Sequence, residues 1–213
     1  MDVERLLREL PRQFADFPRS ATPTDRRLQP LCAAVEGLSE ENNVALLALA
    51  AGCLEAGECY VEAGSYRGRS LIAAALGGAG TAIGIDNFSF DDSDPQGLAV
   101  NVERFGVADR VRVIDGDTVA VLGDHALPPV GVFFYDADHS TAATRAALDA
   151  VRPHLAGSAL IVVDDAEWPK VQAATDAFVA ANPEAALRLR IAGRADGQPW
   201  WWDGMDLVAW TRA

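Results

Sequence analysis

The sequence has little that would suit a secreted or a membrane-spanning protein. It contains only 3 cysteines, an odd number without C-x-x-C spacing, so we expect reduced thiols and no disulfide framework. No apolar run reaches the roughly 18 residues that span a bilayer. The first ten residues carry acidic side chains and no apolar core, unlike a secretory signal peptide. These features predict a cytoplasmic protein without a membrane span.

Basic residues are also scarce. The 18 Lys and Arg are outnumbered by 31 Asp and Glu, which gives a formal net charge of −13. A surface that binds phosphates needs clustered Lys and Arg, and this sequence has no basic run. The charge therefore disfavours nucleic acids, anionic membranes and highly phosphorylated acceptors as partners, and its field would favour neutral or cationic ligands.

Apolar strands alternate with longer helical patterns from about Ser39 to Ala181, as is typical of a parallel α/β sheet. We expect an α/β fold with a Rossmann-like, seven-stranded, mostly parallel sheet, helices on both faces and an antiparallel C-terminal strand. This domain would span residues 39–213, after an N-terminal helical arm or lid at residues 1–38. The expected strands lie at 59–63, 81–86, 110–115, 130–136, 159–165, 187–191 and 207–211.

Acidic residues recur where the first five predicted strands end. Open parallel sheets bind ligands outside the carboxyl ends of their strands. Asp is also a good helix N-cap, so one or two such acids could simply begin the following helices. An acid at every one of five strand ends favours a binding site there instead. These acids are Glu62, Asp86, Asp115, Asp136 and Asp164.

The turn after the first predicted strand suits a nucleoside and not a dinucleotide. Gly64 lets the backbone turn sharply and pass close to a ligand. The G-x-G-x-x-G fingerprint of dinucleotide sites would need glycine where Tyr66 and Arg69 stand, which disfavours a nicotinamide-dependent reductase. Asp86 follows Gly64 by 22 residues, where a carboxylate can accept hydrogen bonds from both hydroxyls of a ribose. The pattern thus predicts an adenosine site.

A second pair of acids, Asp115 and Asp117, follows the third predicted strand at the same edge. A carboxylate and free backbone groups there could bind the adenine edge. Asp117 could equally serve as the N-cap of the short helix after it.

Three stretches together resemble the class I S-adenosylmethionine-dependent methyltransferases: VEAGSYRGRS, AIGID and VRVIDGDT. They depart from the commonest E/D-x-G-x-G-x-G form and are closer to a subgroup with E-x-G-S/T-x-x-G-x-S, which includes small-molecule O-methyltransferases. The resemblance, which covers about Cys59 to Ala181, implies Gly64 and Ser65 near the methionine moiety, Asp86 on the ribose and Asp117 by the adenine. The residues expected to contact the methyl donor are Glu62, Ala63, Gly64, Ser65, Ser70, Asp86, Asn87, Asp115, Gly116, Asp117 and Asp136.

Acids from two further strand ends suggest a metal site. Asp136 ends the fourth predicted strand, and Asp164 and Asp165 end the fifth, 28 residues later. One strand–helix–strand unit fits this spacing, so the two strand ends can lie about 4.8 Å apart. Carboxylates this close repel one another unless they are protonated or neutralised. Oxygen ligands favour Mg²⁺, with Mn²⁺ or Ca²⁺ as alternatives, whereas helix caps and exposed acids would need no metal.

This arrangement also resembles the metal sites of catechol-type methyltransferases and of macrolide- and aminocoumarin-sugar O-methyltransferases. The resemblance implies Asp136, Asp164 and Asp165 as metal ligands. Some of the sugar enzymes have a catalytic histidine three residues after the first ligand, where His139 stands, whereas catechol enzymes use a lysine that this stretch lacks. We therefore predict a Mg²⁺-dependent O-methyltransferase that acts on a small molecule, with a sugar preferred and His139 and Asp136 as the catalytic residues.

Two alternatives remain open at this stage. One is a catechol or other phenolic O-methyltransferase with the same metal site, and the other is a non-catalytic small-molecule-binding protein on the same fold.

The segments around the predicted site suggest how it is covered. Three consecutive tryptophans between Gln198 and Gly204 cannot all face one core, so they could bind a sugar, form a contact in an expected homodimer, or cover a lid hinge. The loop at 87–97 could close over the donor. Bases of the N-terminal arm could border the acceptor pocket, namely Arg19, Arg26 and Arg27.

Overall fold

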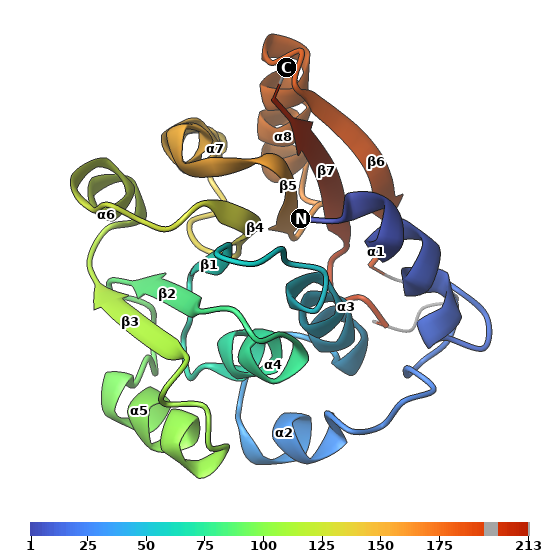
Figure 1. Ribbon diagram of the computed structural model, residues 1–213, viewed down its shortest axis with the longest axis vertical. Coiled ribbons are helices and arrows are strands. Elements are labelled where there is room, and N and C mark those ends of the chain that lie inside the picture. The colour runs from blue at the N-terminus through green and yellow to red at the C-terminus, as the bar shows by residue number, and fades with distance from the viewer. Residues whose placement is uncertain (194–199, 213) are drawn as a thin grey trace.

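A single seven-stranded sheet organises the molecule, in the order β3-β2-β1-β4-β5-β7-β6 (Figure 1). The computed structural model describes residues 1–193 and 200–212. Strands β1 to β5 pair in parallel, and β7 runs antiparallel to both β5 and β6. The predicted fold class is confirmed. The strands are β1 Cys59–Ala63, β2 Ala82–Asp86, β3 Val111–Asp115, β4 Val130–Tyr135, β5 Leu155–Asp164, β6 Ala185–Ile191 and β7 Met205–Thr211.

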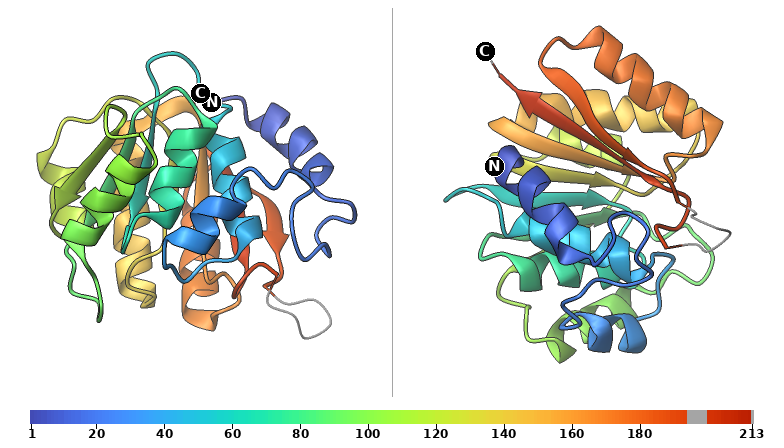
Figure 2. Two further views of the ribbon diagram at one scale, coloured as in Figure 1. Left: turned by 90° about the horizontal axis from the view of Figure 1, so that it is seen from below. Right: turned by 90° about the vertical axis from the view of Figure 1, so that its right-hand side faces the viewer.

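Helices cover both faces of this sheet, as the two turned views of Figure 2 show. On one face lie α3 (Glu41–Ala51), α4 (Arg69–Gly77) and α5 (Pro95–Arg104), together with the N-terminal helices α1 (Val3–Glu9) and α2 (Gln29–Ala34). On the other face lie α6 (Thr118–Asp124), α7 (Thr141–Val151) and α8 (Pro169–Ala181). None of the helices in the described part of the chain has the length and apolar character to cross a membrane.

The central strands are apolar on both sides because each face packs against helices. Every residue of β4 is buried. Two consecutive residues of this strand, Phe133 and Phe134, belong to different core clusters on opposite faces of the sheet. Successive side chains of a strand point to opposite faces, so a strand buried on both sides needs an unbroken apolar run. This explains why β1 and β4 could be predicted closely from composition alone.

The N-terminal segment is part of the main core. Leu6, Leu10 and Leu31 are each at most 1% exposed and share a cluster with α3 and α4. The middle tryptophan of the triplet, Trp201, is also buried, and its indole N–H donates to the carbonyl oxygen of Pro18 at 2.7 Å. Its ring lies 5.2 Å from that of Phe14.

Trp201 therefore fastens the connection before β7 to the N-terminal segment, while Trp200 and Trp202 are half-buried. Gln198 and Pro199, the start of the predicted tryptophan loop, lie outside the described residues.

Candidate functional site

A cavity of about 450 Å³ opens at the carboxyl ends of β1, β2 and β4, where the sequence predicted a ligand. A cavity of this size is typical of small-molecule sites. Residues 36–39 of the N-terminal segment and part of the loop after β2 line it as well. The predicted donor contacts that line it are Gly64, Ser65, Ser70, Asp86, Asn87, Gly116, Asp117 and Asp136.

Glu62, Ala63 and Asp115, also predicted to contact the donor, are not among the residues that line this cavity. Glu62 is fully buried within β1, one residue before the strand ends, and the hydroxyl of Tyr60 donates to it at 2.8 Å. Burial raises the pKa of Glu62 to about 8. Asp115 ends the edge strand β3 and is exposed.

Gly64 brings the turn after β1 against the end of β4. Its φ is +88°, and a Cβ on it would overlap the backbone carbonyl oxygen of Asp136. Left-handed backbone and close approach are both conditions that glycine meets at little cost. The sequence therefore needs glycine here to place the donor-side turn beside Asp136.

Asp86 shapes the same turn. Its carboxylate accepts backbone N–H groups from Ser65 at 2.7 Å, Tyr66 at 2.8 Å and Phe88 at 2.7 Å. A carboxylate offers about four lone-pair sites, so these three bonds leave one for a ligand. Contact with a ribose hydroxyl stays a prediction. Asp117 caps α6 by accepting the N–H of Ala120 at 3.0 Å, and it also lines the cavity. Its contact with the adenine stays a prediction.

Arg69 has a structural task that the sequence did not reveal. Its guanidinium donates to the carbonyl oxygens of Val35 at 2.8 Å, Ser39 at 2.7 Å and Cys32 at 3.3 Å. Five donors on one planar group allow this threefold contact. Arg69 thus holds the N-terminal segment where residues 36–39 close the cavity.

The three arginines of the N-terminal segment that were expected to border the acceptor do not line this cavity. Arg26 forms an ion pair with Glu41 at 3.0 Å, and Arg27 forms one with Asp25 at 3.2 Å. Neither these two nor Arg19 is among the residues that line the cavity. The loop after β2 does contribute, through Phe90, which is 60% exposed and lies 6.0 Å from the Tyr66 ring.

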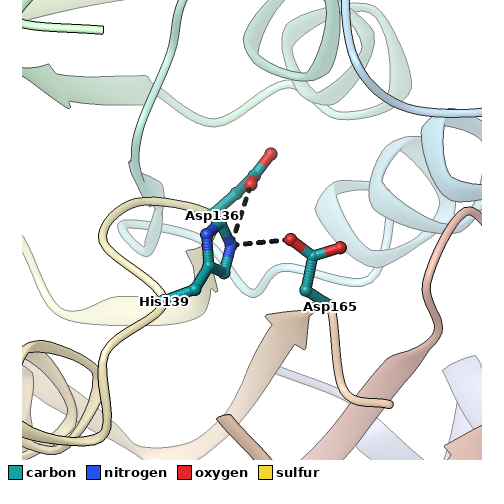
Figure 3. Close-up of side chains that lie close together, drawn as sticks. All are labelled: Asp136, His139 and Asp165. Atoms are coloured by element: carbon teal, nitrogen blue, oxygen red, sulfur yellow. Dashed lines mark ion pairs between the residues drawn. The ribbon is translucent and has the colours of Figure 1, made fainter. Parts of the chain in front are cut away.

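Asp136, His139 and Asp165 form a compact cluster beside the cavity (Figure 3). The imidazole Nε2 of His139 lies 2.9 Å from an oxygen of Asp165 and 3.7 Å from an oxygen of Asp136. One ligand atom from each residue lies within 4.8 Å of the other two. Adjacent parallel strands produce this cluster, because β4 and β5 end in register at Tyr135 and Val163.

Asp164, the third predicted metal ligand, is not a member of this cluster in the described structure. It is 1% exposed at the tip of β5, and its Oδ1 receives a long hydrogen bond of 3.4 Å from the amide of Asn43. Burial, together with the charges of Asp136 and Asp165, raises the pKa of Asp164 well above its usual range.

The donor set fits a hard cation. Buried carboxylates crowd together here, and Oδ1 of Asp165 has no hydrogen-bond partner among the described residues. Asp165 also holds a left-handed conformation, with φ +51°, a strain that tends to persist where function requires it. Burial alone would lower the pKa of His139, but its close contacts with the carboxylates of Asp136 and Asp165 raise that pKa to about 10. In this arrangement His139 is the protonated partner of two carboxylates.

Trp168 is a site neighbour that the sequence analysis missed. Its ring lies 5.2 Å from that of His139, and its indole N–H donates to Asp203 at 3.1 Å. The side chain is 44% exposed although it is large and apolar. The sequence feature that could have indicated this contact is the position of Trp168, three residues after Asp165 and just before the proline that begins α8.

Comparison with known families decides what kind of domain this is. A family model described as "Methyltransferase domain" matches residues 61–166, which include both the donor-side turn and the acidic cluster. These residues form a methyltransferase domain. No curated protein sequence matches this methyltransferase.

Solved structures share the fold of this methyltransferase at low sequence identity. Cofactor-bound Rv0187 from MTB is 23% identical, with 89% of this chain and 91% of that chain covered and a TM-score of 0.67. The O-methyltransferase TomG from Streptomyces achromogenes, in complex with SAM, is 18% identical over 89% and 92% of the chains, with a TM-score of 0.66. CalS11, a TDP-rhamnose 3'-O-methyltransferase, is 20% identical over 97% and 92%, with a TM-score of 0.59.

The prediction of a methyltransferase is thereby confirmed, and the solved structures confirm the predicted fold. Mg²⁺ dependence, preference for a sugar, the roles of individual residues, the homodimer and the cytoplasmic location stay predictions.

Proposed function

We propose that this methyltransferase is a divalent-metal-dependent O-methyltransferase that transfers a methyl group from S-adenosylmethionine to a hydroxyl of a small molecule, preferably a sugar. The observation that carries the proposal is the cluster of Asp136, His139 and Asp165 at the rim of the donor-sized cavity. The donor would occupy that cavity, with its methionine moiety near Gly64 and Ser65 and its adenosine between Asp86 and Asp117.

The acidic residues would hold the metal. Asp136 and Asp165 provide oxygens at the tips of adjacent strands, and Asp164 adds a third carboxylate directly before Asp165. Oxygen-only ligands suit Mg²⁺. When bound, the ion would lower the pKa of the acceptor hydroxyl and fix its position.

His139 is the proposed base. Once the charges of Asp136 and Asp165 are neutralised, the pKa of His139 falls towards its ordinary range, where the imidazole can accept a proton at neutral pH. Its Nε2 faces both carboxylates and would then receive the proton of the acceptor hydroxyl. The hydroxyl oxygen would attack the methyl carbon as the bond from that carbon to the sulfonium sulfur breaks and S-adenosylhomocysteine leaves. Alignment of the two substrates would supply much of the acceleration.

The surroundings of His139 support a neutral sugar as the acceptor. Trp168 offers a flat apolar face beside the imidazole, and such faces commonly bind sugar rings. The net charge of −13 favours a neutral acceptor over a phosphorylated one. CalS11, which shares the fold, methylates TDP-rhamnose, although its phosphorylated acceptor differs in charge from the one favoured here.

Methyl transfer from radiolabelled S-adenosylmethionine, measured across sugars and catechols with and without Mg²⁺, tests this function. We expect incorporation into a sugar that requires Mg²⁺ and disappears in excess EDTA. Full turnover in EDTA would refute the metal role, and incorporation into catechols alone would assign the phenolic alternative.

A further inference from the structure

Asn43 joins three parts of the chain behind the acidic cluster. It lies in the first turn of α3, and its side chain is fully buried. Its amide nitrogen is 3.4 Å from Oδ1 of Asp164 and 3.5 Å from the backbone oxygen of Trp201. These partners are 121 and 158 residues away in sequence, so Asn43 meets them only in the folded protein.

Packing alone does not explain an asparagine at this position. The following residues of α3 are apolar and mostly buried, and Oδ1 of Asn43 has no hydrogen-bond partner in the described part of the chain. A buried amide that is only partly hydrogen-bonded destabilises a fold relative to an apolar side chain of similar size. An asparagine that stands here at such a cost to stability is expected to have a role besides packing.

We propose that Asn43 is a positioning residue that orients the Asp164 carboxylate for the metal, an inference that rests on the proposed function. Among the described residues, Asn43 is the side chain that donates a hydrogen bond to Asp164. Asp136 and Asp165 are oriented by His139, but Asp164 lies outside that contact. A neutral amide can orient a carboxylate without neutralising it, whereas Lys or Arg would replace the cation.

The neighbouring Asn42 provides a matched control. It is also fully buried on α3, has an unpartnered Oδ1 among the described residues, and donates to the backbone oxygen of Ser20 at 2.8 Å. Within the described part of the chain, its side chain makes no hydrogen bond to the acidic cluster. Replacing either asparagine by leucine removes one buried, partly hydrogen-bonded amide, so the stability of the two variants should change by similar amounts.

Calorimetric titration of the full-length protein with Mn²⁺ tests the inference, alongside thermal unfolding without metal. Outer-shell partners of metal ligands typically change affinity by about 10- to 100-fold. We expect Asn43→Leu to raise the Kd for Mn²⁺ by about that factor, and Asn42→Leu to leave it within about 3-fold. Asn43→Ser, whose hydroxyl is too short to reach Asp164, should weaken Mn²⁺ binding in the same way and guards against a leucine variant that does not fold.

The possible outcomes separate this inference from the proposed function. Equal Mn²⁺ affinity in the wild type and both Asn43 variants would overturn the positioning role and leave the metal site standing. If the Asn42 and Asn43 variants weakened Mn²⁺ binding equally, Asn43 would have only a structural role. A wild type that does not bind Mn²⁺ would remove the metal role and this inference with it.

Discussion

Replacing Gly64 by alanine should damage both stability and donor binding, because two separate costs meet at this residue. The left-handed conformation, with φ +88°, costs a residue with a Cβ about 1–2 kcal/mol. The added methyl group would also fall far inside the ordinary contact distance of about 3.5 Å from the carbonyl oxygen of Asp136. Relieving such an overlap costs about 1–3 kcal/mol more, so we expect Gly64→Ala to lose about 2–5 kcal/mol.

Gly57 separates these two costs. Its φ is +85°, almost the same as that of Gly64, but nothing lies within 4 Å of a Cβ built there. Gly57→Ala should therefore lose only the conformational part, about 1–2 kcal/mol. Urea unfolding followed by circular dichroism measures both variants against the wild type.

Donor binding provides the second readout. Moving the turn after β1 away from Asp136 displaces Ser65, whose N–H is bonded to Asp86 in the cavity wall. Calorimetric titration with S-adenosylhomocysteine should thus show weaker binding for Gly64→Ala and unchanged binding for Gly57→Ala. If both variants lost the same stability and bound the ligand equally well, the close approach of the two turns would not matter and the reasoning would be refuted.

Three further substitutions test other parts of the site. His139→Ala should lower kcat by about 100-fold or more at neutral pH if this imidazole is the base, and an unchanged rate would place the base elsewhere. Trp168→Ala should raise the KM for the acceptor while leaving the KM for S-adenosylmethionine unchanged, and equal changes in both would contradict an acceptor-side role. Glu62 favours its protonated form in the folded state, with a pKa of about 8 against an ordinary 4.5, so its stabilising contribution is present below about pH 4.5 and lost as pH rises to about 8. Glu62→Gln should flatten the loss of unfolding free energy over this window in urea titrations, and an unaltered slope would assign the pH dependence to other groups.

Sequence patterns predicted the parts of the fold that depend on neighbouring residues. Unbroken apolar runs located β1 and β4 closely, and acids at strand ends located the edge of the sheet where the cavity lies. β5 begins at Leu155, four residues before the predicted start. The prediction began too late because Gly157 and Ser158 interrupt the apolar run of this strand. Pairing with neighbouring strands extends β5 across this interruption, since Leu155 pairs with β4 and Ser158 with β7.

Contacts between distant segments could not be predicted in this way. Asn43 reads as an ordinary polar residue of a helix until folding brings it to Asp164. Trp201 is distinguished from its two neighbouring tryptophans only by the pocket that Phe14 and Pro18 form around it. The sequence placed His139 near the acids, but its protonated state follows from the distances to both carboxylates, which only the folded chain defines.

The strand order places most of the cavity lining and the acidic cluster at neighbouring positions along one edge of the sheet. Turns after β1, β2 and β3 line the cavity proposed for the donor, while residues that follow β4 and β5 form the acidic cluster. Asp136 and His139 belong to both. Residues 165–168, which follow β5, do not line this cavity, so variation there can alter the acceptor side of the proposed site without rebuilding the cavity proposed for the methyl donor. A lineage of such proteins could diversify its products by changing one side of the sheet and inheriting the other intact.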